Sequence, residues 1–263
     1  MARGRTNPAM VTRLAGAERR TLPDKVVVEE PMTIRLDDHL VATTMRTPGN
    51  DFELAVGFLF TEGLLVGERV SEVRYCATGS AVDTNFNVVS VSTNGRAPTP
   101  EARLGATTSS CGICGSASID DLAERLAPRP GRPMAFDLEV VAAVADKVRA
   151  EQEVFALTGS IHAAAAFDPV TAAVALVRED VGRHNAVDKV VGRLHLDARL
   201  PATELAMFVS GRISFEIVQK AWAAGFGLLV GVSGPTALAI DTAKRANLTL
   251  AGFLRGDSVN LYT

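Results

Sequence analysis

The second half of the chain alternates apolar strand-like segments with helix-like segments, and this pattern restricts the fold more than any other sequence feature. The strand segments are apolar almost throughout, which is typical of strands buried on both faces of a sheet. The pattern therefore predicts an α/β sheet that is covered by helices. The predicted strands are 160–167, 172–177, 205–209, 227–232, 248–254 and 259–262, and the predicted helices are 138–155, 185–194, 214–223 and 235–246.

The first half is predicted to be smaller and rich in β structure. Short strands are expected at 25–29, 32–36, 40–45 and 87–91, and one helix is expected to begin at Asn50 or Asp51. The segment 127–133, Ala-Pro-Arg-Pro-Gly-Arg-Pro, has the composition of a linker. We therefore predict an α+β protein overall, with a mobile tail at 1–23, a β-rich domain at 24–133 and an α/β domain at 134–263.

Composition excludes several classes of protein. The chain of 263 residues is 47% hydrophobic and 22% charged, which indicates a globular protein with an ample core. A net charge of −3 argues against a general nucleic-acid binder. The N-terminus lacks the apolar region of a secretory signal, and the longest apolar run, 221–232, is too short to cross a bilayer. With only three cysteines, we expect no disulfide scaffold and a cytoplasmic location where thiols stay reduced.

Cys111 and Cys114 form a Cys-x-x-Cys pair between glycines, within a stretch of small polar residues. Nothing in this stretch resembles core sequence, and the glycines favour a backbone that leaves both sulfurs accessible. Ser118 and Asp121 have the spacing of a helix cap, so the pair is expected just before a helix N-terminus. Backbone N–H groups there stabilise a thiolate, which is the reactive form of cysteine.

Such a pair fits three kinds of chemistry: half of a zinc site, a redox dithiol or a sulfur-transfer pair. A closed zinc site needs four ligands, and neither Cys76 nor the four histidines form a second pair with suitable spacing. A thioredoxin-like motif is expected after the strand of a βαβ unit, not in a β-rich domain. Cys76, with strand-type neighbours, is interpreted as a small buried hydrophobe, and His162 as a satisfied core histidine.

Polar segments also follow the predicted strands. In the run 179–189, Arg183 and Lys189 could hold a phosphate or a carboxylate and His184 could act as an acid or base, although a capped helix start would look similar. The turns 210–214 and 233–236 each combine small residues with a helix N-terminus that can bind an anion. The turn 253–260 carries a cation, a carboxylate and an amide, as an ordinary hairpin turn also would.

Four of these segments, in this order, resemble the FdhD family of sulfurtransferases accessory to formate dehydrogenase. They are Ser-Cys-Gly-Ile-Cys-Gly at 110–115, Glu-Asp-Val-Gly-Arg-His-Asn-Ala-Val-Asp-Lys at 179–189, Ser-Gly-Arg-Ile-Ser-Phe-Glu at 210–216 and Phe-Leu-Arg-Gly-Asp at 253–257. The resemblance implies a homodimer whose C-terminal domain is cytidine-deaminase-like. It also implies a relay that takes sulfur from a cysteine desulfurase to the molybdenum (or tungsten) bis-guanine-dinucleotide cofactor of formate dehydrogenase. Deamination is excluded, because His162 lacks the following x-Glu and no Pro-Cys-x-x-Cys comes after it.

The resemblance also suggests roles for individual residues. Cys111 is expected to carry the persulfide, and Cys114 to assist it or to resolve it as a disulfide. Two alternatives are a cofactor-binding chaperone without sulfur transfer and a domain stapled by zinc. The residues predicted to contact the cofactor are Phe253, Leu254, Arg255, Gly256, Asp257, Ser258 and Arg212. Arg183 and His184 are ranked below them as cofactor contacts.

Overall fold

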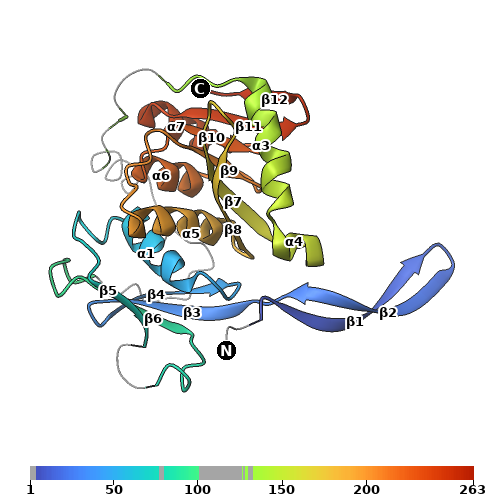
Figure 1. Cartoon of the computed structure of the whole chain (residues 1–263), viewed down its shortest axis with the longest axis horizontal. Coiled ribbons are helices and arrows are strands. Elements are labelled where there is room, and N and C mark those ends of the chain that lie inside the picture. The colour runs from blue at the N-terminus through green and yellow to red at the C-terminus, as the bar shows by residue number, and fades with distance from the viewer. Residues whose placement is uncertain (1–3, 77–79, 101–125, 127, 130–132) are drawn as a thin grey trace.

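The computed structural model describes residues 4–76, 80–100, 126, 128–129 and 133–263 (Figure 1). The strands are β1 (Thr6–Ala15), β2 (Glu18–Val27), β3 (Glu30–Leu36), β4 (His39–Arg46), β5 (Glu72–Tyr75), β6 (Val88–Ser92), β7 (His162–Phe167), β8 (Val174–Asp180), β9 (Ala206–Val209), β10 (Leu228–Gly231), β11 (Thr249–Arg255) and β12 (Ser258–Leu261). The helices are α1 (Asp51–Thr61), α3 (Leu138–Ala150), α4 (Glu153–Thr158), α5 (Arg183–Leu196), α6 (Phe215–Ala223) and α7 (Ala237–Ala246).

A six-stranded sheet with the order β12-β11-β10-β9-β7-β8 forms the centre of the molecule. Strands β9, β10 and β11 are parallel, and β7 runs antiparallel to both of its neighbours, β9 and β8. Strand β8 therefore points the same way as β9, and the carboxyl ends of β8, β9, β10 and β11 share one edge of the sheet. The predicted α/β pattern is confirmed.

The sheet is buried on both faces because successive strand residues point to opposite sides. In β9, Met207 packs with the cluster formed by α5, α6 and α7, whereas Phe208 packs with the cluster formed by α3. The same alternation places Leu229 on the first side and Val230 on the second. Figure 1 shows α5 to α7 on one face and α3 on the other. This double burial explains why the strand sequences are apolar throughout.

A smaller four-stranded sheet, β4-β3-β6-β5, packs against α1, which in turn lies on α5. The two helices touch backbone to backbone at glycines. A Cβ at Gly57 would lie 1.8 Å from the carbonyl oxygen of Asp188, and a Cβ at Gly192 would lie 1.8 Å from that of Glu53. Only glycine permits this approach, so these two positions fix how the smaller sheet sits on the larger one.

The N-terminal segment differs from the mobile tail that we predicted for residues 1–23. Strands β1 and β2 pair in antiparallel register from Thr6 and Val27 to Ala15 and Glu18. We call this two-stranded ribbon the arm, and it projects away from the rest of the molecule (Figure 1). The prediction failed because five arginines in the first 20 residues obscured the strand pattern of Val11, Thr12 and Leu22. None of the described helices is long and apolar enough to span a membrane.

Candidate functional site

All four polar segments that follow the predicted strands come together at one edge of the six-stranded sheet. Asp180 ends β8, Ser210 follows β9, and Arg255 ends β11. The second anion-type turn, which begins near Ser233, follows β10. These strands point the same way, so their carboxyl ends lie next to one another, which is where open α/β sheets place ligands.

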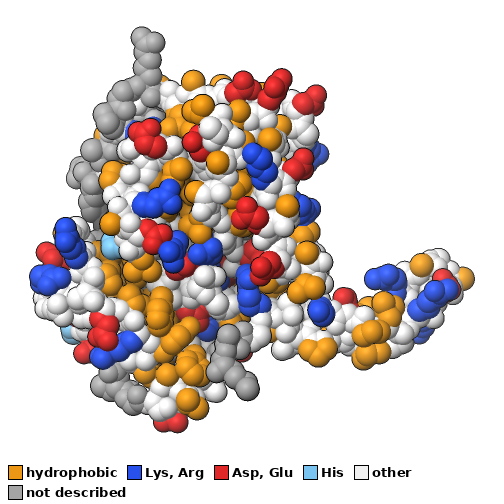
Figure 2. Space-filling view, viewed as in Figure 1, with side chains coloured by type: hydrophobic (Ala, Val, Ile, Leu, Met, Phe, Trp, Pro, Cys, Tyr) orange, Lys and Arg blue, Asp and Glu red, His pale blue; other side chains and the backbone are white. Residues whose placement is uncertain are grey.

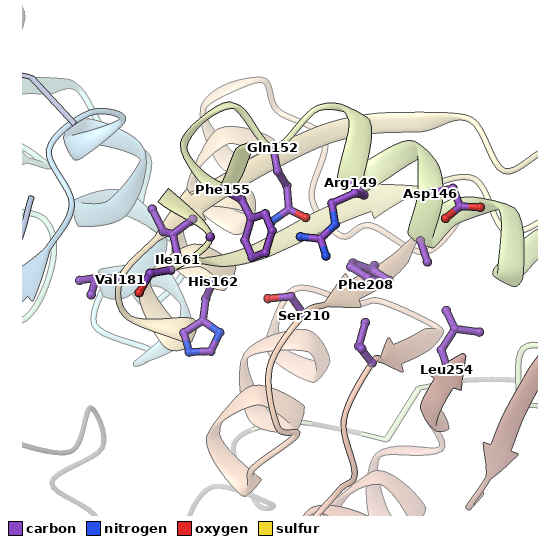
Figure 3. Close-up of a pocket in the computed structure, with 14 residues that line it drawn as sticks. Asp146, Arg149, Gln152, Phe155, Ile161, His162, Val181, Phe208, Ser210 and Leu254 are labelled. Atoms are coloured by element: carbon purple, nitrogen blue, oxygen red, sulfur yellow. The ribbon is translucent and has the colours of Figure 1, made fainter. Parts of the chain in front are cut away.

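A cavity of about 630 Å³ opens at this edge, between the strand ends and the junction of α3 with α4. We call it the cleft. Figure 3 shows side chains from α3 and α4 on one side and from β7 and the end of β9 on the other. The side chains that matter for the argument are those of Arg149, Gln152, Phe155, His162, Ser210 and Leu254.

Gln152 is the most informative residue of the cleft. It is only 5% exposed, and it lines the cavity. In the part of the chain that the structure describes, no protein group forms a hydrogen bond with its side-chain amide. The amide atoms are not among the fully buried unpaired atoms of the described residues, so they open to the cavity, where the amide can both donate and accept a hydrogen bond.

Arg149 and Phe155 form a second element of the cleft. The guanidinium carbon of Arg149 lies 3.8 Å from the centre of the Phe155 ring, and both side chains line the cavity (Figure 3). The flat stack of a cation on an aromatic ring holds the guanidinium in place and keeps its N–H groups available. This wall of the cleft can therefore hold a planar or an anionic group.

His162 lies on the opposite wall, at the first position of β7. Burial lowers its pKa, and the charges of Arg183 and His184 lower it further, against an opposing effect of Asp180. The ring is therefore neutral near pH 7, with one nitrogen able to donate and the other to accept. The prediction of a satisfied core histidine is wrong, because the first residue of a strand borders the sheet edge and not the core.

Ser210 completes the polar lining beside His162. Its Oγ accepts a hydrogen bond of 2.9 Å from the backbone N–H of Ala163, so its own hydroxyl proton remains available to the cleft. Gly211 follows, and a Cβ there would lie 3.2 Å from Nδ1 of His162. The small residues of this turn thus leave room for the imidazole.

The run 179–189 serves mainly to join the two halves of the molecule. Lys189 is 1% exposed, and its Nζ lies 2.7 Å from Oδ2 of Asp180 and 3.0 Å from the carbonyl oxygen of Thr47. Its interpretation as a ligand for phosphate is wrong, because the ammonium is already enclosed by protein oxygens. Asp180 also accepts from the backbone N–H of Thr47 at 3.2 Å.

A second buried ion pair lies deeper in the same junction. Nζ of Lys220 is 2.9 Å from Oδ2 of Asp188, 2.9 Å from Oγ1 of Thr61 and 3.3 Å from Oε1 of Glu62. Burial favours the neutral amine, but the charges of Asp188 and Glu62 outweigh it and raise the pKa of Lys220. We call the buried polar set between α1, α5 and α6 the polar seam; its members are Thr47, Thr61, Glu62, Asp180, Asp188, Lys189 and Lys220.

Two more residues of the run support the walls of the cleft. The carboxylate of Glu179 accepts hydrogen bonds from the backbone N–H groups of Val154 at 2.9 Å and Phe155 at 2.8 Å, which holds α4 in place. Nε2 of His184 lies 3.2 Å from Oγ of Ser214 and 3.6 Å from a carboxylate oxygen of Glu216. Arg183 remains a candidate for ligand binding, because its Nε is buried without a hydrogen-bond partner among the described residues and its charge acts on His162, which lines the cleft.

The two anion-type turns are bonded to each other. The backbone N–H of Ile213 donates to the carbonyl of Gly234 at 3.2 Å, and that of Thr236 donates to Ile213 at 3.0 Å. Oγ1 of Thr236 caps α7 by accepting from Ala239 at 3.2 Å. Arg212 is exposed at the surface between the turns. The turns thus form one continuous ledge beside the cleft.

The 253–258 segment is a hairpin turn between β11 and β12, with Arg255 opposite Ser258. A β-bulge gives Phe253 a positive φ of 55° and turns its ring onto the glycine of the neighbouring turn, where a Cβ at Gly234 would lie 2.4 Å from the ring. Leu254 lines the cleft. The predicted cofactor segment therefore borders both the ledge and the cleft.

The predicted catalytic residues Cys111 and Cys114 lie outside the described residues, as does the cap pattern of Ser118 and Asp121. Cys76 is buried, and its Sγ lies 3.2 Å from Oγ1 of Thr84, which confirms its interpretation as a buried residue. Within the described ranges, no cluster of His, Cys, Asp or Glu has the arrangement of a metal site.

Comparison with known proteins gives a consistent result. Residues 27–263 match the family described as FdhD/NarQ. The chain is 46% identical to the sulfur carrier protein FdhD of Streptomyces coelicolor, over 98% of this chain and 93% of that one. It is 43% identical to the protein of the same name from Mycolicibacterium paratuberculosis, over 98% and 97%. A protein from Desulfotalea psychrophila, assigned as a formate dehydrogenase accessory protein, shares the fold with a TM-score of 0.76 at 21% identity, over 99% of this chain and 97% of that one.

Proposed function

The chain belongs to the FdhD/NarQ family, and from this premise we propose that it is a sulfur carrier that serves formate dehydrogenase as a sulfurtransferase. It takes persulfide sulfur from a cysteine desulfurase and transfers it to the molybdenum bis-guanine-dinucleotide cofactor, which is its substrate and cargo. The observation that carries the proposal is the meeting of the family segments 179–189, 210–216 and 253–257 around one cleft.

In the loading step, the thiolate of Cys111 attacks the terminal sulfur of the desulfurase persulfide. The S–S bond of the donor breaks, its cysteine leaves as a thiolate, and Cys111 becomes the persulfide. No electrons are gained or lost overall, because the sulfur moves between two cysteines. The rate of such an exchange depends on the thiolate fraction and on access to the sulfur.

In the delivery step, the thiolate of Cys114 attacks the inner sulfur of the Cys111 persulfide. A Cys111–Cys114 disulfide forms, and the outer sulfur leaves as sulfide, which the metal of the cofactor accepts. The sulfur is reduced at the expense of the two thiols, so a dithiol reductant must restore them before the next cycle.

The cleft and the turn beside it bind the cofactor. The Gln152 amide hydrogen-bonds to the edge of a heterocycle, Arg149 and Phe155 cover its face or hold a phosphate, and His162 and Ser210 contribute from the opposite wall. Hydrogen bonds from a buried amide and a held guanidinium both fit a guanine base with its phosphates. The remaining contacts come from Phe253, Leu254, Arg255, Gly256, Asp257, Ser258 and Arg212.

The proposed function also includes an oligomeric state, a cellular location and a division into two domains. The protein works as a homodimer in the cytoplasm, where thiols stay reduced, and meets both the desulfurase and formate dehydrogenase there. Its two domains divide near residue 133, and the second, 134–263, is cytidine-deaminase-like in topology. The chemistry differs from deamination, because the sequence lacks the zinc-binding signature.

Intact-protein mass spectrometry tests sulfur loading. The chain is incubated with a cysteine desulfurase and cysteine, and wild type is compared with Cys111→Ala and Cys114→Ala. We expect wild type to gain one sulfur that reductant removes, and Cys111→Ala to gain none. Cys76→Ala is the matched control, because this buried thiol is not part of the relay and its variant should load fully.

The competing function is a chaperone that binds the cofactor and transfers no sulfur. It predicts that Cys111→Ala and Cys114→Ala both retain the ability to activate formate dehydrogenase. Wild type that never gains sulfur, together with active cysteine variants, would replace our proposal with this one. Loading at Cys114 alone would reverse the two roles and keep the carrier function.

A further inference from the structure

The arm exposes large apolar side chains along one face. Met10 is 69% exposed and Leu14 is 64% exposed. The register pairs Met10 with Pro23, and Oγ1 of Thr12 lies 3.3 Å from Oγ1 of Thr21, so these residues share one face of the ribbon. An isolated two-stranded hairpin is marginally stable in water unless a third strand or another apolar surface covers it.

The arm is attached firmly at its base and reaches away from its own body. The backbone N–H of Val28 donates to the carbonyl of Arg5 at 3.0 Å, and the Arg5 guanidinium lies 3.3 Å from the buried carboxylate of Glu179. Figure 1 shows the ribbon extending past α4 with no other element beside its outer half. The base fixes the direction of the arm, so its own body does not cover the outer apolar face.

The charge of the arm indicates what covers it. Between residues 6 and 27, four side chains are basic and two are acidic, whereas the whole chain has a net charge of −3. The remainder of the chain is therefore acidic on balance. Figure 2 shows hydrophobic side chains along the arm and basic ones near its far end. A basic, apolar arm complements an acidic body of the same protein.

We propose that the arm docks on a second copy of this chain, and that the two copies exchange arms across a two-fold axis. Each arm then loses its exposed apolar face against the body of the partner. Such an exchange forms a closed, self-complementary interface, since the same surfaces meet twice. This inference rests on the homodimer proposed above and adds the element that builds it.

Sedimentation velocity of the full chain over a dilution series tests the proposal. The double variant Met10→Ser/Leu14→Ser is compared with wild type and with Val170→Ser/Leu238→Ser, which removes two exposed apolar side chains elsewhere. We expect the arm variant to raise the dimer dissociation constant by about 100-fold or more. The control variant should dimerise as wild type does, and dimerisation should weaken with salt.

Hydrogen exchange gives a second readout that does not depend on variants. Some backbone amides at the edges of the arm are not hydrogen-bonded between β1 and β2. In wild type these amides should exchange more slowly as the protein concentration rises. A stable dimer whose arm stays unprotected and whose arm variant dimerises normally would overturn the inference and leave the dimer intact. A chain that stays monomeric throughout would overturn both the inference and the dimer, but not sulfur loading at Cys111.

Discussion

The polar seam and the cleft both contain charged and amide side chains near the ends of β8 and β9, but they use them in opposite ways. In the seam, Lys189 and Lys220 are each 1% exposed or less, and each ammonium contacts several protein oxygens. In the cleft, Gln152 is 5% exposed, and its amide opens to the cavity without a protein partner among the described residues. Polar side chains that are paired with protein groups thus stabilise the fold, whereas those without a protein partner are available to a ligand.

Removing one partner of a buried ion pair in the polar seam should have the largest effect on stability. We expect Asp188→Ala to lower the free energy of unfolding by about 3–5 kcal/mol, because Lys220 would stay buried without its closest carboxylate. Urea denaturation measures the change. Asp197→Ala is the control, since its ion pair with Arg193 is partly exposed and should contribute only about 0.2–1 kcal/mol. Equal effects would mean that the seam contributes no special stability.

The next largest effect should come from the helix contact that encloses the seam. In Gly192→Ala, the new Cβ would lie 1.8 Å from the carbonyl oxygen of Glu53, so α1 and α5 must move apart. Overpacking of this kind lowers the free energy of unfolding by about 1–3 kcal/mol or more. Thermal unfolding checks it. An unchanged melting temperature would show that the helices separate freely.

On the cleft side, we expect binding to change while stability does not. Gln152→Leu removes an amide without a protein partner, so the free energy of unfolding should stay within about 1 kcal/mol of wild type. Binding of guanosine diphosphate, used as a probe of the cofactor, should weaken by about tenfold, the effect of one lost hydrogen bond. Calorimetry measures both quantities. A large loss of stability with unchanged binding would place Gln152 with the seam.

The smallest expected effect is a change in how the stability of the fold depends on pH. The pKa of His162 is lowered from its ordinary value of 6.5, so the folded protein resists protonating it while the unfolded chain does not. Stability is therefore unaffected above pH 6.5 and decreases as the pH falls below that value. His162→Gln should reduce this decrease. His195 is the comparison, because burial alone lowers its pKa, and His195→Gln should leave the contribution of His162 in place.

The sequence predicted the large sheet well, because strands buried on both faces have an unmistakable run of apolar residues. It misjudged Lys189, because a buried ion pair and a phosphate site contain the same residue types. The difference depends on Thr47, whose carbonyl lies 142 positions away along the chain. The sequence also missed Arg149 and Gln152, which resemble the ordinary polar end of an amphipathic helix until the strand ends are placed opposite them.

The contact between α1 and α5 at Gly57 and Gly192 has a structural consequence. At these glycines the two helix backbones are too close for any side chain to fit between them, so α1 and α5 form one closely packed pair. The first turn of α5 is itself bonded to the end of β8, because the side-chain amide of Asn185 donates to Oδ1 of Asp180 at 3.1 Å. The smaller sheet is therefore connected, through α1 and α5, to the strand ends that border the cleft.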